Sequence, residues 1–166
     1  LNVTATSSAD VVTFVGTGSG TVDIASGQTL TLNQSGTSDY TGTIDGLGGL
    51  TKAGIGELTL SGGSANTYSG DTNVDNGTLV LDKAAGTDAV SGVVNLNGGI
   101  LQLAADDQIA DGAQVNFDGG TFNTGGFSEG NDATPPSGSG IGTLKLVSDS
   151  TIDFSGTADI LRFTDD

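Results

Sequence analysis

The 166-residue sequence contains no cysteine, histidine, methionine or tryptophan and only two prolines. A structural zinc site needs cysteine or histidine ligands, and thiol or Ser-His-Asp catalysis needs side chains that are missing, so these classes are excluded. Lysine and arginine number four against twenty acidic residues, which gives a formal net charge of −16. Because so acidic a chain repels phosphate, we expect no nucleic-acid binding. No run of about 18 apolar residues occurs, so we also expect no membrane insertion.

The residues that are present form a repeat of about 22 residues. Valine, isoleucine and threonine are placed at regular intervals, which argues against disorder despite the 29 glycines. An apolar-x-apolar signature recurs with spacings of 28, 21, 22, 21 and 22 residues, beginning at Leu30, Leu58, Leu79, Leu101, Phe122 and Leu144. A second register runs in step, with the pairs Asn73-Val74, Asn95-Leu96 and Asn116-Phe117. Apolar-x-apolar is the pattern of a strand with one buried face, and the glycines between the signatures supply turns.

This repeat predicts an all-β fold, a parallel β-helix (β-solenoid) of about six or seven coils of roughly 22 residues. Strands this short cannot bury enough surface alone, whereas stacking them about 4.8 Å apart buries a continuous apolar column. A β-sandwich is the alternative fold. Residues 1–166 then form a single domain, with an N-terminal strand region at 1–28, a loop leaving the coil within 103–113 and an inserted surface loop at 128–140. The repeated asparagines are expected to form an amide ladder on the outside.

One segment resembles a known family. Residues 48–81 include Gly49-Leu50-Thr51-Lys52, Gly56-Glu57-Leu58-Thr59-Leu60, Asn66-Thr67-Tyr68-Ser69-Gly70 and Gly77-Thr78-Leu79-Val80-Leu81. This sequence is similar to the autotransporter-associated β-strand repeat, also called the passenger-associated transport repeat. The resemblance implies a right-handed β-helix that is bacterial and extracellular or on the cell surface, and it implies a scaffold instead of an enzyme.

The residues considered for catalysis, calcium binding or sugar binding are interpreted as structural. Asp106 and Asp107 invite comparison with carboxylate pairs in polysaccharide-cleaving β-helices, but strand neighbours point to opposite faces, so we interpret them as a solvated loop pair. The eighteen aspartates suit weak, nonspecific Ca²⁺ bridging, yet no calcium-binding motif is present, and we expect no cofactor, no metal site and no catalytic residue. Tyr40 and Tyr68 are 28 residues apart, and we expect them to form a stacked structural column more than platforms for a sugar.

The ends of a solenoid leave strand edges that accept further strands. Apolar residues gather near both termini, and we name them as candidates for self-association: Val11, Val12, Phe14, Val15, Ile160, Leu161 and Phe163. The sequence therefore predicts a non-enzymatic extracellular structural protein that associates head to tail with copies of itself into a surface fibre or matrix. The alternative is an adhesin or display passenger module whose loops bind a surface or an extracellular glycan.

Overall fold

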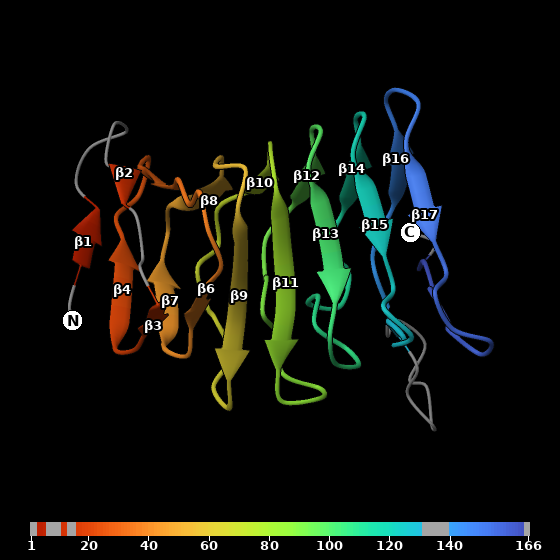
Figure 1. The fold of residues 1–166 in the computed structure, drawn as a ribbon, viewed down its shortest axis with the longest axis horizontal. Coiled ribbons are helices and arrows are strands. Elements are labelled where there is room, and N and C mark those ends of the chain that lie inside the picture. The colour runs from red at the N-terminus through yellow and green to blue at the C-terminus, as the bar shows by residue number, and fades with distance from the viewer. Residues whose placement is uncertain (1–2, 6–10, 13–15, 131–139, 165–166) are drawn as a thin grey trace.

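A computed structural model describes residues 3–5, 11–12, 16–130 and 140–164. The chain winds as a parallel β-solenoid whose successive coils lie side by side along a rod, from β1 at one end to β17 at the other (Figure 1). No helix occurs among these residues, and accordingly none is long and apolar enough to cross a membrane. The predicted all-β parallel β-helix is confirmed.

Three parallel sheets form the sides of the rod. Sheet A contains β1 (Val3–Ala5), β4 (Thr21–Ile24) and β7 (Thr43–Gly46). Sheet B contains β2 (Val11–Val12), β5 (Thr29–Leu32), β8 (Gly49–Lys52), β10 (Thr72–Val74), β12 (Val94–Leu96), β14 (Val115–Phe117) and β16 (Leu144–Leu146). Sheet C contains β3 (Gly16–Gly18), β6 (Ser38–Tyr40), β9 (Glu57–Gly62), β11 (Thr78–Lys83), β13 (Ile100–Leu103), β15 (Thr121–Asn123) and β17 (Thr151–Asp153). Beyond β7, the side of sheet A continues through the isolated bridges Val90↔Ile109 and Ile141↔Phe163.

The register of the strands gives the length of each coil. In sheet C the offset between neighbouring strands is 20 to 22 residues over five steps, as in the pair Leu79↔Leu101, and 30 residues in the last step, Phe122↔Ile152. The longer last coil contains residues 131–139, which lie outside the described residues. The coil length of about 22 residues is therefore the rule, with one insertion.

Strand alternation builds the core. Every second residue of a strand points inward, and these positions hold stacked aliphatic and aromatic side chains, as in the column Leu58, Leu79, Leu101 and Phe122. Burying one such side chain contributes about 1.5–3 kcal/mol. Because each coil covers the apolar side chains of the coil before it, the stability of the rod comes from stacking along its axis.

The signature series is correct in its middle and wrong at both ends. Leu30 pairs with Leu50 in sheet B, whereas Leu58 lies in sheet C, so the spacing of 28 joins two different sheets. Leu144 also lies in sheet B, where it pairs with Val115 and extends the column of Val94 and Val115 instead of following Phe122 in sheet C. Sheets B and C carry the same apolar-x-apolar pattern. Because the last coil is longer, its sheet B strand lies about 22 residues after Phe122, where the repeat predicts the next strand of sheet C.

Candidate functional site

The outer side of sheet B carries the expected asparagine ladder. The Nδ2 of Asn116 donates to Oδ1 of Asn95 at 2.7 Å, and the Nδ2 of Asn95 donates to Oδ1 of Asn73 at 2.9 Å. Asn73 in turn donates to Oγ1 of Thr51 at 3.2 Å. All three asparagines are half-buried between fully buried neighbours. The side-chain amides of Asn73, Asn95 and Asn116 thus form hydrogen bonds that connect successive coils along the outer side of sheet B.

In the last coil, side chains at the inward-facing strand positions are exposed to solvent. Leu144 and Leu146 of β16 continue the columns of Val115 and Phe117, which are fully buried, yet Leu146 is 69% exposed. On sheet C, Ile152 continues the column of Phe122 and is likewise exposed. Among the described residues no strand pairs on the far side of β16 or β17. This end of the rod therefore offers apolar side chains together with open strand edges.

The sequence-predicted self-association residues fall at the two opposite ends of the rod. Val11 and Val12 form β2, the outermost strand of sheet B, while Phe14 and Val15 lie outside the described residues. At the other end Ile160 is exposed. Leu161 and Phe163 differ from it because they are half-buried against the core, and their backbones pair with Glu129 and Ile141. The fold does not bring the two sets together within one molecule.

Two of the four cationic side chains lie inside the solenoid, which the sequence analysis did not anticipate. The Nζ of Lys83 donates to the carbonyl oxygens of Gly42 at 2.9 Å and Ser61 at 2.8 Å, joining three coils. The Nζ of Lys52 donates to the carbonyls of Gly54 and Asn76. Burial lowers the pKa of both amino groups, although the Asp39 carboxylate acts in the opposite direction on Lys83.

These lysines had a signal in the sequence. In Leu50-x-Lys52 and Leu79-x-Leu81-x-Lys83 each lysine continues the alternation of inward-facing residues. This alternation did not lead to a prediction of buried lysines, because lysine is normally found at the surface. Backbone carbonyl oxygens provide the acceptors that make the inward position of both lysines tolerable.

Asp106, Asp107 and Glu129 form a polar corner beside Ser128 and Gly130. Asp106 and Asp107 lie in a loop and are half-exposed, as expected for a loop pair, but their carboxylates also form hydrogen bonds to the backbone, which the prediction did not include. The Oδ1 of Asp106 accepts from the Ser128 N–H and the Oδ1 of Asp107 from the Gly130 N–H, each at 2.8 Å. Asp107 also has a positive φ of 52°, which a short polar side chain tolerates better than most. The two carboxylates thus fasten the following coil to their own.

The same contacts correct the prediction of an exposed loop over 128–140. Ser128, Glu129 and Gly130 are buried at one side of the insertion and Gly140 is buried at the other. A Cβ at Gly130 would come within 2.7 Å of the Cα of Gly140, so the chain leaves and re-enters the coil at neighbouring points. The rest of the predicted loop, residues 131–139, lies outside the described residues.

Glu129 is the most perturbed carboxyl group in the corner. It is 1% exposed, and its Oε1 and Oε2 accept the N–H groups of Ile109 at 3.1 Å and Gln108 at 3.0 Å. Burial raises the pKa of Glu129 to about 8; the two N–H groups oppose this change, and nearby Asp107 and Asp88 add to it. Because this pKa lies above 7, Glu129 is mainly uncharged at neutral pH.

The tyrosines are structural but do not share a column. Tyr40 pairs with Leu60 in sheet C, and its hydroxyl donates to the Gly20 carbonyl at 3.0 Å. Tyr68 lies on another side of the coil, fully buried, with its hydroxyl 2.6 Å from Oγ1 of Thr72. The expectation of one stacked column is wrong because the spacing of 28 again links two sides of the rod.

Over the described part of the chain, no three acidic side chains converge closely enough to hold a metal ion. The carboxyl groups of the polar corner, those of Asp106, Asp107 and Glu129, accept backbone N–H groups.

Comparison with known proteins finds a repeat family and relatives among autotransporters. Residues 50–81 match the Passenger-associated-transport-repeat family, which confirms the resemblance read from the sequence. The chain is 36% identical over 143 residues, 80% of its length, to the adhesin BmaC autotransporter of Brucella suis biovar 1 (strain 1330). It is 32% identical over 133 residues to the probable autotransporter YfaL of Escherichia coli (strain K12) and 33% identical over 114 residues to an extracellular serine protease of Serratia marcescens.

These similarities cover most of this chain and little of the relatives. The matched segments take up 73% and 69% of this chain for the second and third relatives, but only 4%, 10% and 9% of the three relatives' own lengths. No solved structure matches the chain. Over most of its length the chain therefore resembles segments of autotransporters, and residues 50–81 carry the passenger-associated transport repeat.

Proposed function

We propose that this chain is a non-enzymatic structural module of a bacterial passenger protein, located outside the cell or on its surface, whose rods stack end to end into a fibre or matrix. The passenger repeat at 50–81 and the autotransporter relatives support the location. The observation that carries the assembly is the open last coil, where Leu146 and the 52% exposed Phe154 leave apolar surface beside the free edges of β16 and β17.

The composition supports the non-enzymatic role. The chain has no histidine, so it cannot by itself supply a Ser-His-Asp triad even though one relative is a serine protease. The proposal includes no resident cofactor, and Ca²⁺ acts at most as a weak, nonspecific bridge between acidic rods. Melting with and without EDTA should give the same transition temperature, and a clear drop in EDTA would contradict this part of the proposal.

Assembly is tested by sedimentation and negative-stain electron microscopy at rising protein concentration. The wild-type chain should form filaments one rod wide, and Leu146→Asp should abolish them because it places a charge in the apolar end. Ile55→Asp is the matched control, since Ile55 is a large apolar residue at least as exposed as Leu146 but lies on the side of the rod. Monodisperse short rods at all concentrations, or equal losses in both variants, would overturn the proposal.

A second candidate function is display or adhesion, in which the loops bind a surface or glycan. The 143-residue similarity to a protein named as an adhesin favours it. The anchored base of the insertion, with Gly130 and Gly140 adjacent, is suited to presenting residues 131–139 without disturbing the coil. Binding of the wild-type chain to a glycan array, reduced on deletion of residues 131–139, is the expected result; unchanged binding would exclude the insertion as a binding element.

A further inference from the structure

A polar groove of about 330 Å³ crosses three successive coils on the side of the rod, remote from the last coil. It lies at the corner where the chain enters sheet B, between the turns that precede β5, β8 and β10. The side chains along it are Gln28, Thr29, Leu47, Asp71 and Asn73, with glycines between them. Its volume is at the small end of the range of about 300–1,000 Å³ that is typical of ligand pockets.

Glycines make this corner hollow. Gly49 lies beside Thr29 in sheet B, and a Cβ on it would come within 2.7 Å of the Asp71 carbonyl oxygen. A Cβ on Gly70 would likewise come within 2.5 Å of the backbone of Gly48. The coils therefore approach too closely for side chains here, and the floor of the groove is backbone.

The polar groups around this floor are held in position. The Asn73 amide accepts from Asn95 and donates to Thr51 as part of the asparagine ladder, which fixes its orientation. Asn95 also approaches Oδ2 of Asp71 at 3.5 Å. A carboxylate can accept about four hydrogen bonds, so the exposed Asp71 retains capacity toward a ligand.

Leu47 gives the groove an apolar wall. Its side chain is 65% exposed, although a leucine in this fold is normally an inward-facing core residue. Gly46, with φ of 102°, turns the chain immediately before it. Beside this apolar surface stand one carboxylate, two amides and one hydroxyl, a set that can pair with a ring bearing hydroxyl groups on its edge and C–H groups on its face.

We propose that this groove binds a neutral sugar of one or two rings. Asp71 accepts hydrogen bonds from ring hydroxyls, the Gln28 and Asn73 amides pair with neighbouring hydroxyls, and Leu47 packs against the C–H face. Among the described residues that line the groove, Asp71 is the only one with an ionisable side chain, and the net charge of −16 repels anionic saccharides. The proposal rests on the second candidate function and adds to it a site on the rod itself, separate from the insertion.

Titration of the ¹⁵N-labelled chain with the methyl glycosides of glucose, galactose, mannose and N-acetylglucosamine tests the site. At least one of them should shift the amide resonances of residues 27–29, 47–49 and 70–73. Asp71→Ala should weaken that binding about tenfold, the loss of roughly one charged hydrogen bond. Asp82→Ala is the control, because Asp82 is an exposed aspartate on sheet C.

Leu47→Ala provides a second variant that needs no change in charge, and it should weaken binding while leaving the rest of the spectrum in place. No shift at the groove with any of the four glycosides, or equal weakening by Asp82→Ala, would overturn the proposal. Filament formation is measured on the same proteins: Asp71→Ala should still form filaments and Leu146→Asp should still bind sugar. The two measurements thereby distinguish a loss of sugar binding in the groove from a loss of end-to-end assembly.

Discussion

Replacing Glu129 by glutamine should change how the stability of the rod depends on pH. The carboxyl group is buried and its pKa is raised to about 8 from the ordinary 4.5. Between these two pH values the folded chain holds a proton that the unfolded chain has lost. The contribution of Glu129 to stability is therefore complete below about pH 4.5, falls as the pH rises, and is lost once the pH passes 8.

The size of this effect follows from the same two values. Each pH unit between them corresponds to about 1.36 kcal/mol, so the wild-type chain loses up to about 5 kcal/mol of unfolding free energy from this group between pH 4.5 and pH 8. Relaxation of the last coil around the charge reduces this figure, and a loss of about 1 kcal/mol is enough for the test. Glu129→Gln removes the titration altogether.

Glutamine suits this position because the preceding coil already uses it. The Oε1 of Gln108 accepts the Lys83 backbone N–H at 2.7 Å, just as Glu129 accepts the N–H of Gln108 one coil later. At pH 5 the variant should be less stable by about 1 kcal/mol, because an amide offers one acceptor where a carboxyl group offers two oxygens. At pH 9 it should be as stable as the wild type or more so.

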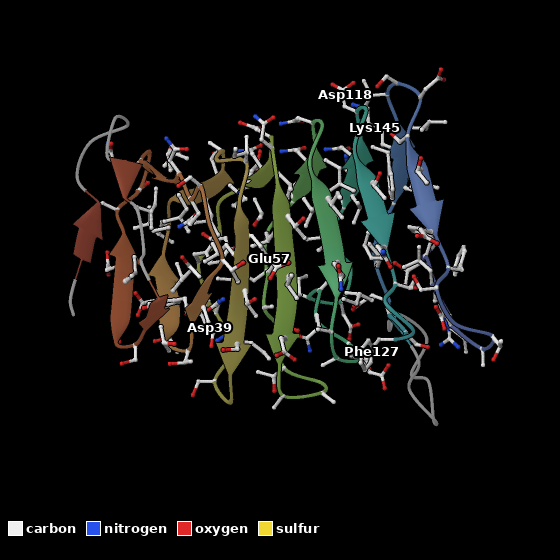
Figure 2. The ribbon with its side chains drawn as sticks, in the orientation of Figure 1. Asp39, Glu57, Asp118, Phe127 and Lys145 are labelled. Atoms are coloured by element: carbon white, nitrogen blue, oxygen red, sulfur yellow. The ribbon has the colours of Figure 1, made fainter. Side chains whose placement is uncertain are left out.

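The assay is urea unfolding of both proteins at pH 5 to 9, with the difference in unfolding free energy as the readout. Taking the difference cancels the titration of the buried lysines. Glu57→Gln is the control, because this other glutamate of the chain is only half-buried on β9 (Figure 2). A difference that stays constant from pH 5 to 9 would refute the reasoning.

Three further perturbations test how the coils are held together. Lys83→Met should lower the unfolding free energy by about 2–3 kcal/mol in urea, because two buried carbonyl groups lose their donor; a neutral result would show that water replaces the amino group. Gly70→Ala should prevent folding or lower the melting temperature sharply in circular dichroism, because the new Cβ would lie 2.5 Å from the backbone of Gly48. Gly63→Ala should leave the melting temperature unchanged, because no heavy atom beyond its chain neighbours lies within 4 Å of the new Cβ. Asn95→Ala should cost about 1–2 kcal/mol in urea by interrupting the ladder, and an effect no larger than that of Asn97→Ala at the turn would contradict the ladder's role.

The sequence predicted the solenoid because its central coils are regular. The spacings between Leu58, Leu79 and Leu101 and between Val74 and Leu96 equal the register of neighbouring strands in sheets C and B. The ends could not be placed in the same way, since the two sheets carry the same pattern and the spacing alone does not say which one a strand joins. An insertion changes the spacing between successive strands, and a strand of one sheet can then lie at the position that the repeat predicts for the other sheet.

The polar interior was harder to predict than the apolar one. Glu129 and Asp106 belong to residue types that are normally at the surface, and their partners are backbone N–H groups of a different coil. No local sequence pattern specifies such a pairing, because it depends on which turn lies above which. The buried lysines differ, since strand alternation already placed them inward.

The distribution of charge explains why the ends differ from the sides of the rod. With Lys52 and Lys83 inside, the cations that remain outside the core are Lys145 and Arg162, and both belong to the last coil, as Figure 2 shows for Lys145. The sides of two rods lying together would bring acid against acid, a repulsion that salt screens over about 8–10 Å at physiological strength. The last coil combines exposed apolar side chains with the cations that can face the acidic surface of another rod. Contact at this end is therefore opposed less by charge than contact along the sides, and the same distribution that keeps rods apart laterally leaves axial stacking available.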